Sequence, residues 1–124
     1  MWNWLASALA SKATVVLYDG SPFYPTPYSL FDLVDQTSTT LFGISAKYLD
    51  SCSKARISPV DSHDLSSLRT ICSTGSTLSA EAFDYVYSSI KTNIHLQSMS
   101  GGTDLCGCLV GGDPTGPVHR GDRR

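Results

Sequence analysis

Two short stretches of small polar residues could together form a ligand site. Residues 73–78 read STGSTL, and residues 98–104 read SMSGGTD. Glycine lets a backbone turn tightly and approach a flat ring, and hydroxyls and amides at the start of a helix attract anions. A threonine followed by an aspartate offers a hydroxyl and a hard oxygen ligand of the kind that Mg²⁺ prefers. The alternative is that both stretches are turns whose residues serve backbone conformation alone.

Each stretch follows an apolar segment that is typical of a buried strand. Short apolar segments bounded by turn residues predict strands at 14–18, 39–45, 68–73, 94–99 and 105–110. Apolar residues at helical spacing predict helices at 2–10, 29–37, 45–56 and 79–90, with Ser29, Ser45 and Ser79 as capping residues.

Strands that alternate with helices of this length predict an α/β fold, namely a partial parallel sheet with flanking helices. In such sheets ligands bind beyond the carboxyl ends of the strands. Residues 73–78 and 98–104 follow two consecutive strands of the predicted sheet. We therefore expect them at the same sheet edge, where they would face one ligand.

The composition excludes several classes of partner. The chain has 124 residues, of which 41% are hydrophobic, and a formal net charge of -2, which is typical of a single globular domain. It has no basic field for nucleic acid, and no apolar run approaches the roughly 20 residues that a membrane span needs. Residues 1–10 predict an amphipathic helix, although a secretory signal is the alternative interpretation.

The cysteine spacing does not favour a metal site. Cys52, Cys72, Cys106 and Cys108 lack the paired C-x-x-C spacing that zinc sites use. They are expected to be free thiols in a reducing compartment, which predicts a cytoplasmic location. Cys106 and Cys108 would pack on one face of the last predicted strand. The P-loop, the dinucleotide fingerprint and the nucleophile elbow of serine hydrolases are all absent.

Four longer segments carry a family resemblance. They begin at residues 1, 40, 63 and 98 and read MWNWLASALASKATVVLYDGSPFYP, TLFGISAKYLDSC, HDLSSLRTICSTGSTLSAEAFDYVY and SMSGGTDLCGCLVGGDPTGPV. The sequence resembles the adenylate-forming acyl-CoA ligases, and within them the branch that activates acetoacetate. The resemblance implies a two-step reaction. Acetoacetate and ATP give an acyl-adenylate and pyrophosphate, and coenzyme A then displaces AMP.

The resemblance also assigns roles to the two polar stretches. The residues that it places at the ATP/AMP site are Gly75, Ser76, Thr77, Ser98, Met99 and Thr103. Gly101 and Gly102 match the wall of the acyl pocket, where small residues would make room for a four-carbon keto acid. Asp104 matches an acidic residue that helps to hold Mg²⁺. No residue here is assigned a catalytic role.

The resemblance divides the chain into a partial AMP-binding (adenylation) domain, residues 1–110, and a tail, residues 111–124, whose glycine, proline and charge predict disorder. The family's phosphate loop and catalytic lysine have no match in these residues, so the isolated chain is expected to be inactive. The alternative is a non-catalytic isoform or translated remnant that associates with other proteins through exposed sheet edges.

Overall fold

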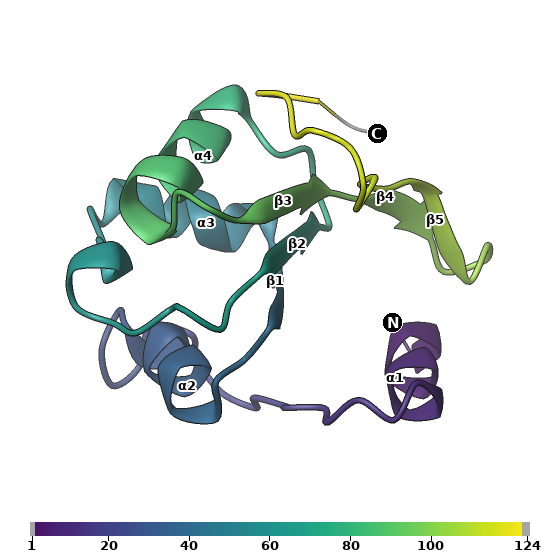
Figure 1. Cartoon of the computed structure of the whole chain (residues 1–124), viewed down its shortest axis with the longest axis horizontal. Coiled ribbons are helices and arrows are strands. Elements are labelled where there is room, and N and C mark those ends of the chain that lie inside the picture. The colour runs from purple at the N-terminus through teal and green to yellow at the C-terminus, as the bar shows by residue number, and fades with distance from the viewer. Residues whose placement is uncertain (1, 123–124) are drawn as a thin grey trace.

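The computed structural model describes residues 2–122, and a small parallel sheet lies at its centre (Figure 1). The helices are α1 (Trp2–Ala10), α2 (Ser29–Thr37), α3 (Ala46–Lys54) and α4 (Ala80–Tyr85). A 3-10 turn spans Pro59–Asp61, and a π-helical turn, Val86–Ile90, continues α4. The strands are β1 (Leu41–Ser45), β2 (Thr70–Thr74), β3 (His95–Ser98), β4 (Ser100–Gly102) and β5 (Gly107–Val110).

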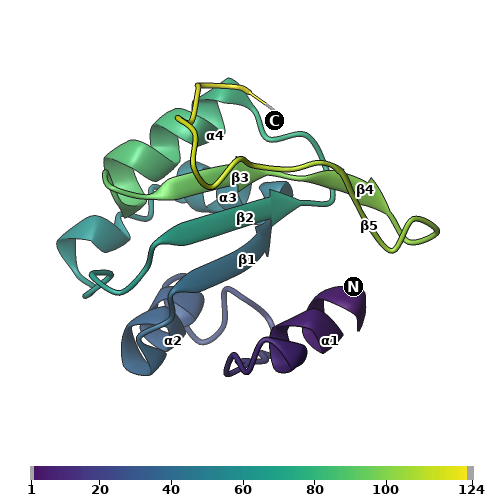
Figure 2. The same cartoon turned by 45° about the vertical axis from the view of Figure 1, so that its right-hand side comes forward.

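The central sheet has three parallel strands in the order β1-β2-β3. Helix α3 connects β1 to β2, and α4 with its π-helical turn connects β2 to β3. Both helices lie against the same face of the sheet and contact each other (Figures 1 and 2). This arrangement confirms the predicted α/β fold.

Two of the three predicted caps hold their helices. The Ser45 side chain accepts a hydrogen bond from the backbone N–H of Tyr48, and the Ser79 side chain accepts one from Ala82. The prediction for Ser29 is wrong, because Ser29 is the first helical residue and its hydroxyl donates to the Thr26 carbonyl. The Ser29 hydroxyl therefore stabilises the turn before α2 and does not cap the helix.

The hydrophobic core lies between α2, α3, α4 and the sheet. Buried members come from every one of these elements: Phe31, Leu49, Ile71, Phe83 and Leu96. The core also extends under the loop before β2, where Leu68 is completely buried. The face of the sheet that carries Ile71 and Leu96 is thus covered by the helices.

The first predicted strand is not a strand. Residues 13–19 have no regular secondary structure, and Leu17 is 73% exposed. The expected apolar face of α1 is also exposed at Ala6, Leu9 and Ala10, while the side chain of Trp2 lies outside the described residues. Within the described residues, no strand pairs with this segment.

The last predicted strand belongs to a separate hairpin. β5 pairs antiparallel with β4 in a two-stranded sheet, with an irregular register between Ser100 and Gly101. Cys106 lies in the turn with a φ of 53°, and both Cys106 and Cys108 are exposed. The prediction that these two cysteines pack on one face of a strand is therefore wrong.

Residues 111–122 run back along the body instead of leaving it. His95 Nε2 lies 2.8 Å from the carbonyl oxygen of Asp113, and Val118 packs against the core. The Arg120 guanidinium donates two hydrogen bonds of 2.8 Å to the Asp84 carboxylate. The sequence predicts a disordered tail, whereas in the structure its described part is attached at several points.

Two further observations concern membrane crossing and the state of the cysteines. No helix within residues 2–122 is long and apolar enough to cross a membrane. All four cysteines are free thiols. Burial raises the pKa of the Cys52 thiol to about 11, so this buried cysteine stays protonated and unreactive at neutral pH.

Candidate functional site

The two polar stretches identified in the sequence meet at the carboxyl ends of β2 and β3. Ser73 and Ser98 are partners in the parallel register. The backbone N–H of Met99 donates to the Ser73 carbonyl at 2.8 Å, which holds the two strand ends together. The prediction that both stretches begin at one sheet edge is confirmed by this pairing.

The loop after β2 leads directly into α4. Gly75 has a φ of 90°, a conformation that L-residues with a side chain rarely adopt. Ser76 and Thr77 follow it and are exposed, and Ser79 then caps the helix. Glycine is required here for backbone conformation, and its positive φ turns the chain from the strand end toward the helix.

A shallow hollow of about 310 Å³ lies beside this loop. Ser76 and Thr77 line one side of it, and Lys47 and Asp50 of α3 line another. Sequence reasoning missed Lys47 and Asp50 because Ser45 ends β1 and caps α3 at once, so no glycine-rich loop marks this junction. The available signal was that α3 begins at the carboxyl end of a parallel strand, as α4 does.

One buried hydroxyl at this edge has no partner. Ser73 is completely buried, and its Oγ makes no hydrogen bond to any described residue. A buried hydroxyl without a partner costs free energy, so such groups are uncommon in folded proteins. Ser98, its cross-strand partner, is also buried. The strand ends thus retain hydrogen-bonding capacity next to the loop that starts at Gly75.

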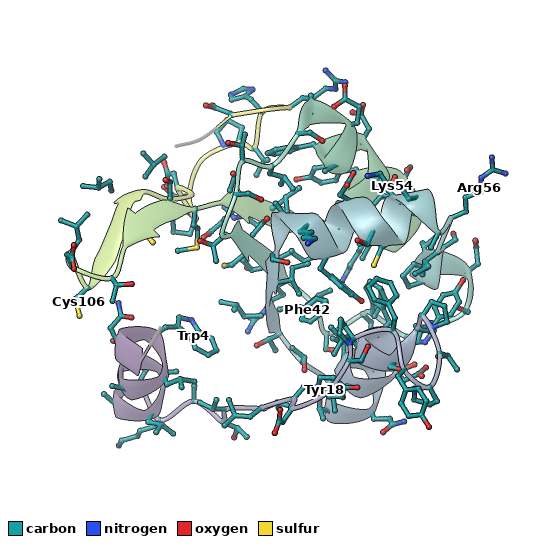
Figure 3. All side chains as sticks on the ribbon, turned by 180° about the vertical axis from the view of Figure 1, so that it is seen from behind. Trp4, Tyr18, Phe42, Lys54, Arg56 and Cys106 are labelled. Atoms are coloured by element: carbon teal, nitrogen blue, oxygen red, sulfur yellow. The ribbon has the colours of Figure 1, made fainter. Side chains whose placement is uncertain are left out.

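Thr103 and Asp104 lie at a different place from the loop after β2. They form the turn of the β4–β5 hairpin, where the Cys106 N–H donates to the Thr103 carbonyl at 3.2 Å. Both residues are exposed, and the hairpin projects away from the body in Figures 1 and 2. Figure 3 shows Cys106 at the tip next to α1, where the Asn3 side chain donates to its carbonyl at 2.7 Å.

Curated sequence relatives of the chain share one activity in their names. Acetoacetyl-coenzyme A synthetase of Rhizobium meliloti (strain 1021) is 53% identical over 122 residues, which are 98% of this chain and 19% of that protein. Acetoacetyl-CoA synthetase of Mus musculus is 48% identical over 98% of this chain and 18% of that protein. No protein-family model matches the chain.

Solved structures point to the same relatives. Acetoacetyl-CoA synthetase from Streptomyces lividans matches with a TM-score of 0.87 and 40% identity over 97% of this chain and 19% of that one. The chain belongs to the acetoacetyl-CoA synthetase family. It spans 18–19% of the length of the two curated relatives named above. The family resemblance stated from the sequence is confirmed.

A solved structure with lower sequence identity has the same fold. The anthranilate CoA ligase AuaEII in complex with anthranoyl-AMP matches with a TM-score of 0.73 over 88% of this chain and 20% of that chain. Its sequence identity is 19%, so the likeness concerns the fold alone. The parallel sheet and its helices therefore have the architecture found in a second CoA ligase.

The residues present fit Mg²⁺ only as a partial site. Within residues 2–122, no three acidic, histidine or cysteine side chains gather closely enough to hold a metal ion. Mg²⁺ is commonly bound by one or two carboxylates together with the phosphates of a substrate. In an acetoacetyl-CoA synthetase, Asp104 could supply one such carboxylate, with the nucleotide supplying the other oxygens.

The two glycines expected at the acyl pocket differ in their surroundings. A Cβ at Gly101 would lie 2.9 Å from the Cα of Cys108 and would collide with the carbonyl oxygen of Gly107. Gly101 therefore allows β4 and β5 to approach each other closely. A Cβ at Gly102 would meet only the Leu105 side chain, at 4.0 Å. Gly102 is exposed and has room for a side chain.

The Cys72 thiol of β2 interacts with the hairpin through Cys108. Burial raises the pKa of the Cys72 thiol, and electrostatic interaction with Cys108 raises it further. Cys72 also lies 3.6 Å from the Gln97 side-chain oxygen, toward which its thiol donates. Cys72 therefore remains a neutral thiol at physiological pH and adds no negative charge next to the base of the hairpin.

Proposed function

We propose that the chain carries part of the adenylate- and acyl-binding surface of an acetoacetate–CoA ligase. The reaction would convert acetoacetate, ATP and CoA into acetoacetyl-CoA, AMP and pyrophosphate. The acetoacetate carboxylate would attack the α-phosphorus with departure of pyrophosphate, and the CoA thiol would then attack the acyl carbonyl with departure of AMP. The observation that carries this proposal is the meeting of residues 73–77 and 98–99 at one sheet edge, in a chain 45–53% identical to acetoacetyl-CoA synthetases.

The family resemblance suggests a different role for each of these residues in the proposed site. The backbone turn at Gly75, with a φ of 90°, would present Ser76 and Thr77 to the adenine. Ser98 and Met99 would lie beside the adenine and the acyl phosphate at the adjacent strand end. Thr103 would bind a phosphate oxygen, Asp104 would hold Mg²⁺, and Gly101 and Gly102 would border the acyl group.

Asp104 and the two glycines at the acyl group can take these positions only if the β4–β5 hairpin lies over the nucleotide. The hairpin is joined to β3 by Met99 alone, and residues 101–109 are exposed. Adenylation depends on in-line geometry and on charge stabilisation of the transferring phosphate. An isolated chain in which Asp104 lies in an exposed turn is therefore expected to form no acetoacetyl-CoA.

The experiment is a titration of the 124-residue chain with a non-hydrolysable acetoacetyl-adenylate analogue, followed residue by residue from amide NMR shifts. We expect saturable shifts at residues 73–79 and 98–99, and their loss in Gly75→Val. Gly111→Val is the matched control, because a Cβ at Gly111 meets nothing within 4 Å and the residue has no positive φ. Saturable shifts confined to the region around His95 and Asp113, or no shifts at millimolar analogue, would contradict the proposal.

A second candidate function is association without catalysis, as an isoform or remnant that binds another protein. Large apolar side chains at the periphery favour it: Leu9, Leu17, Leu105 and Leu109 are between 55% and 77% exposed. Exposed apolar surface beyond scattered single residues marks interaction sites. Absence of any self-association or partner binding together with saturable analogue binding would remove this candidate.

A further inference from the structure

The β4–β5 hairpin is attached to the sheet at both ends of its base. At the entry, the backbone N–H of Met99 donates to the Ser73 carbonyl at 2.8 Å. At the exit, the chain leaves β5 and runs back along β3, as Figure 2 shows. There the carbonyl oxygen of Asp113 lies 2.8 Å from His95 Nε2. The direction in which the hairpin leaves the sheet therefore depends on one backbone attachment and on one side-chain attachment.

Gly112 lets the returning chain approach β3 closely. A Cβ at Gly112 would lie 2.6 Å from Cδ of the Gln97 side chain and would collide with it. A Cβ at the neighbouring Gly111 would meet nothing within 4 Å. Neither glycine has a positive φ. The glycine at 112 is thus required by the close contact of its backbone with Gln97.

A chain of hydrogen bonds determines where His95 carries its proton. The Cys72 thiol donates to Gln97 Oε1 at 3.6 Å, so Gln97 Nε2 faces His95 Nδ1, at 3.1 Å. An amide nitrogen only donates and a carbonyl oxygen only accepts. Nδ1 of His95 must therefore accept, and Nε2 must donate to the Asp113 carbonyl. Both contacts together fit only the neutral imidazole with its proton on Nε2.

The acceptor of this bond belongs to a turn that has its own hydrogen bonds. The Asp113 carboxylate accepts from the backbone N–H and from the hydroxyl of Thr115, at 2.9 and 2.7 Å. These bonds keep the pKa of the Asp113 carboxyl below its ordinary value. The Asp113 carbonyl also accepts from the Gly116 N–H at 3.2 Å. His95 thus binds a turn whose shape is set independently of the hairpin.

We propose that His95 and Gln97 are positioning residues for the β4–β5 hairpin. They hold its exit on β3 and so fix the direction in which Thr103 and Asp104 extend beyond the strand ends. The inference rests on the proposed function, in which Thr103 binds a phosphate oxygen and Asp104 holds Mg²⁺. His95 and Gln97 act through the backbone of residues 112–113 and do not themselves bind the ligand.

The first test measures the orientation of the hairpin in the full 124-residue chain, from residual dipolar couplings of the amides at 70–74 and 101–109. In the unchanged chain one alignment tensor should fit both sets. His95→Phe keeps a ring but removes both hydrogen bonds, so the hairpin couplings should lose this common fit. His95→Gln should restore it, because its amide can still donate to the Asp113 carbonyl. The couplings at 70–74 show in each variant whether the sheet stays folded.

The two neighbouring glycines provide a matched pair of variants. Gly112→Ala should displace Gln97 and give the same loss of the common fit as His95→Phe. Gly111→Ala adds the same methyl group where nothing lies within 4 Å, so it should behave as the unchanged chain does. Equal behaviour of the two alanine variants, or a common fit that survives His95→Phe, overturns the proposal.

A contact at the tip is the competing way to hold the hairpin. There the Asn3 side chain donates to the Cys106 carbonyl at 2.7 Å. Asn3→Ala removes this bond and leaves the base intact, so the common fit should persist. Its loss in Asn3→Ala together with its retention in His95→Phe would assign the positioning to α1 and overturn the proposal.

The imidazole nitrogens of His95 give a spectroscopic signature of the network. At neutral pH, ¹⁵N spectra should show Nε2 protonated and Nδ1 unprotonated. Gln97→Glu replaces the donor at Nδ1 by a carboxylate, which favours the imidazolium form. Since Nε2 still donates in that form, the hairpin should keep its orientation. An Nδ1-protonated neutral ring in the unchanged chain contradicts the network.

The last measurement separates this inference from the proposed function. Mg²⁺ and the non-hydrolysable acetoacetyl-adenylate analogue are added to the unchanged chain and to His95→Phe. Amide shifts should appear at 73–79 in both, and at 103–104 only in the unchanged chain. Equal shifts at 103–104 overturn the positioning role and leave the proposed function intact. Absence of all shifts contradicts the proposed function, and the couplings of His95→Phe then decide the attachment by themselves.

Discussion

The body of the molecule and its two arms contain similar apolar sequences with opposite outcomes. The body, residues 29–98, buries Leu49 and Leu68 completely. The arms are residues 2–19 and the hairpin 100–110, where Leu17 is 73% exposed and Leu109 is 77% exposed. Both regions alternate apolar and polar residues in ways that predict helices and strands. What differs is whether another element lies against the apolar side.

This difference shows what a β-prone segment needs, besides its sequence, to become part of a sheet. β2 lies between β1 and β3 and under α3 and α4, so its alternate residues are buried. Within the described residues, Thr14–Tyr18 has no strand paired with it, and it remains irregular. A β-prone segment becomes a strand only where hydrogen-bonding partners and packing surfaces are supplied.

The largest expected effect comes from the same substitution in the two regions. Leu49→Ala should lower the free energy of unfolding by about 2–5 kcal/mol, because it removes buried methyl groups and leaves a cavity. Leu109→Ala should change it by less than about 0.5 kcal/mol. Urea unfolding measured by circular dichroism compares them, with Leu49→Met as a variant that keeps most of the volume. Equal effects of the two alanine substitutions would erase the distinction between body and arm.

A smaller effect is expected from a lysine that holds the body together. Lys91 Nζ donates to three carbonyl oxygens, at 2.6 Å to Leu65, 3.1 Å to Ser66 and 2.6 Å to Leu68. Lys91→Met should cost about 2 kcal/mol, since hydrogen bonds from a charged donor are worth more than neutral ones and the carbonyls lose their partner.

The matched control for Lys91 is Lys54→Met. Lys54 forms an exposed ion pair with Asp50 at 2.7 Å in the same helix, and such pairs contribute little. Its loss should change the unfolding free energy by less than about 0.5 kcal/mol. If the two methionine variants unfold at the same urea concentration, the three carbonyl contacts do not stabilise the loop before β2.

The third prediction concerns the loop where body and candidate site meet. Gly75→Ala should destabilise the chain by about 1 kcal/mol, because its φ of 90° disfavours a side chain. Gly111→Ala is the control, since a Cβ there also meets nothing within 4 Å but no positive φ is required. Thermal unfolding of both variants separates conformational strain from lack of space. A Gly75→Ala chain as stable as the control would show that the loop relaxes freely.

The sequence predicted the body better than the arms, for a physical reason. The periodicity of residues 68–98 reports a core whose partner elements lie within the same stretch, so β2, α4 and β3 were recognised close to their bounds. The pairing of Ser73 with Ser98 then followed from the rule for parallel sheets. Local patterns in residues 14–18 and 105–110 are equally clear but carry no information on which segment they will meet.

The candidate site shows the same limit. Gly75 and the buried strand ends were predictable because turn chemistry and sheet topology are local or nearly so. The hairpin that carries Thr103 and Asp104 was not, because Gly101 is required by the close approach of β5, which is a tertiary contact. Lys47 was missed because its residue type resembles that of a solvated helix residue, and its one signal is the position of α3 at the carboxyl end of a parallel strand.

The smallest expected effect tests how the tail is attached to the body. The two hydrogen bonds from Arg120 hold the pKa of the Asp84 carboxyl below its ordinary value. Since the folded pKa is lowered, the attachment is complete above the ordinary aspartate pKa and is lost as the pH falls through the lowered value. Protection from hydrogen exchange at residues 111–122, relative to the intrinsic exchange rate at each pH, should therefore fall below about pH 4, and should be lower at neutral pH in Arg120→Gln.

Global unfolding should hardly respond, because the pair is exposed on the surface and joins only the tail to α4. Lys54→Gln provides the matched loss of an exposed cation that bridges no separate segments, and it should leave tail exchange unchanged. If Arg120→Gln behaves like this control, the contacts of His95 and Val118 suffice to hold residues 111–122. Packing would then hold the tail to the body, as it holds β3, and the ion pair would not be needed for this attachment.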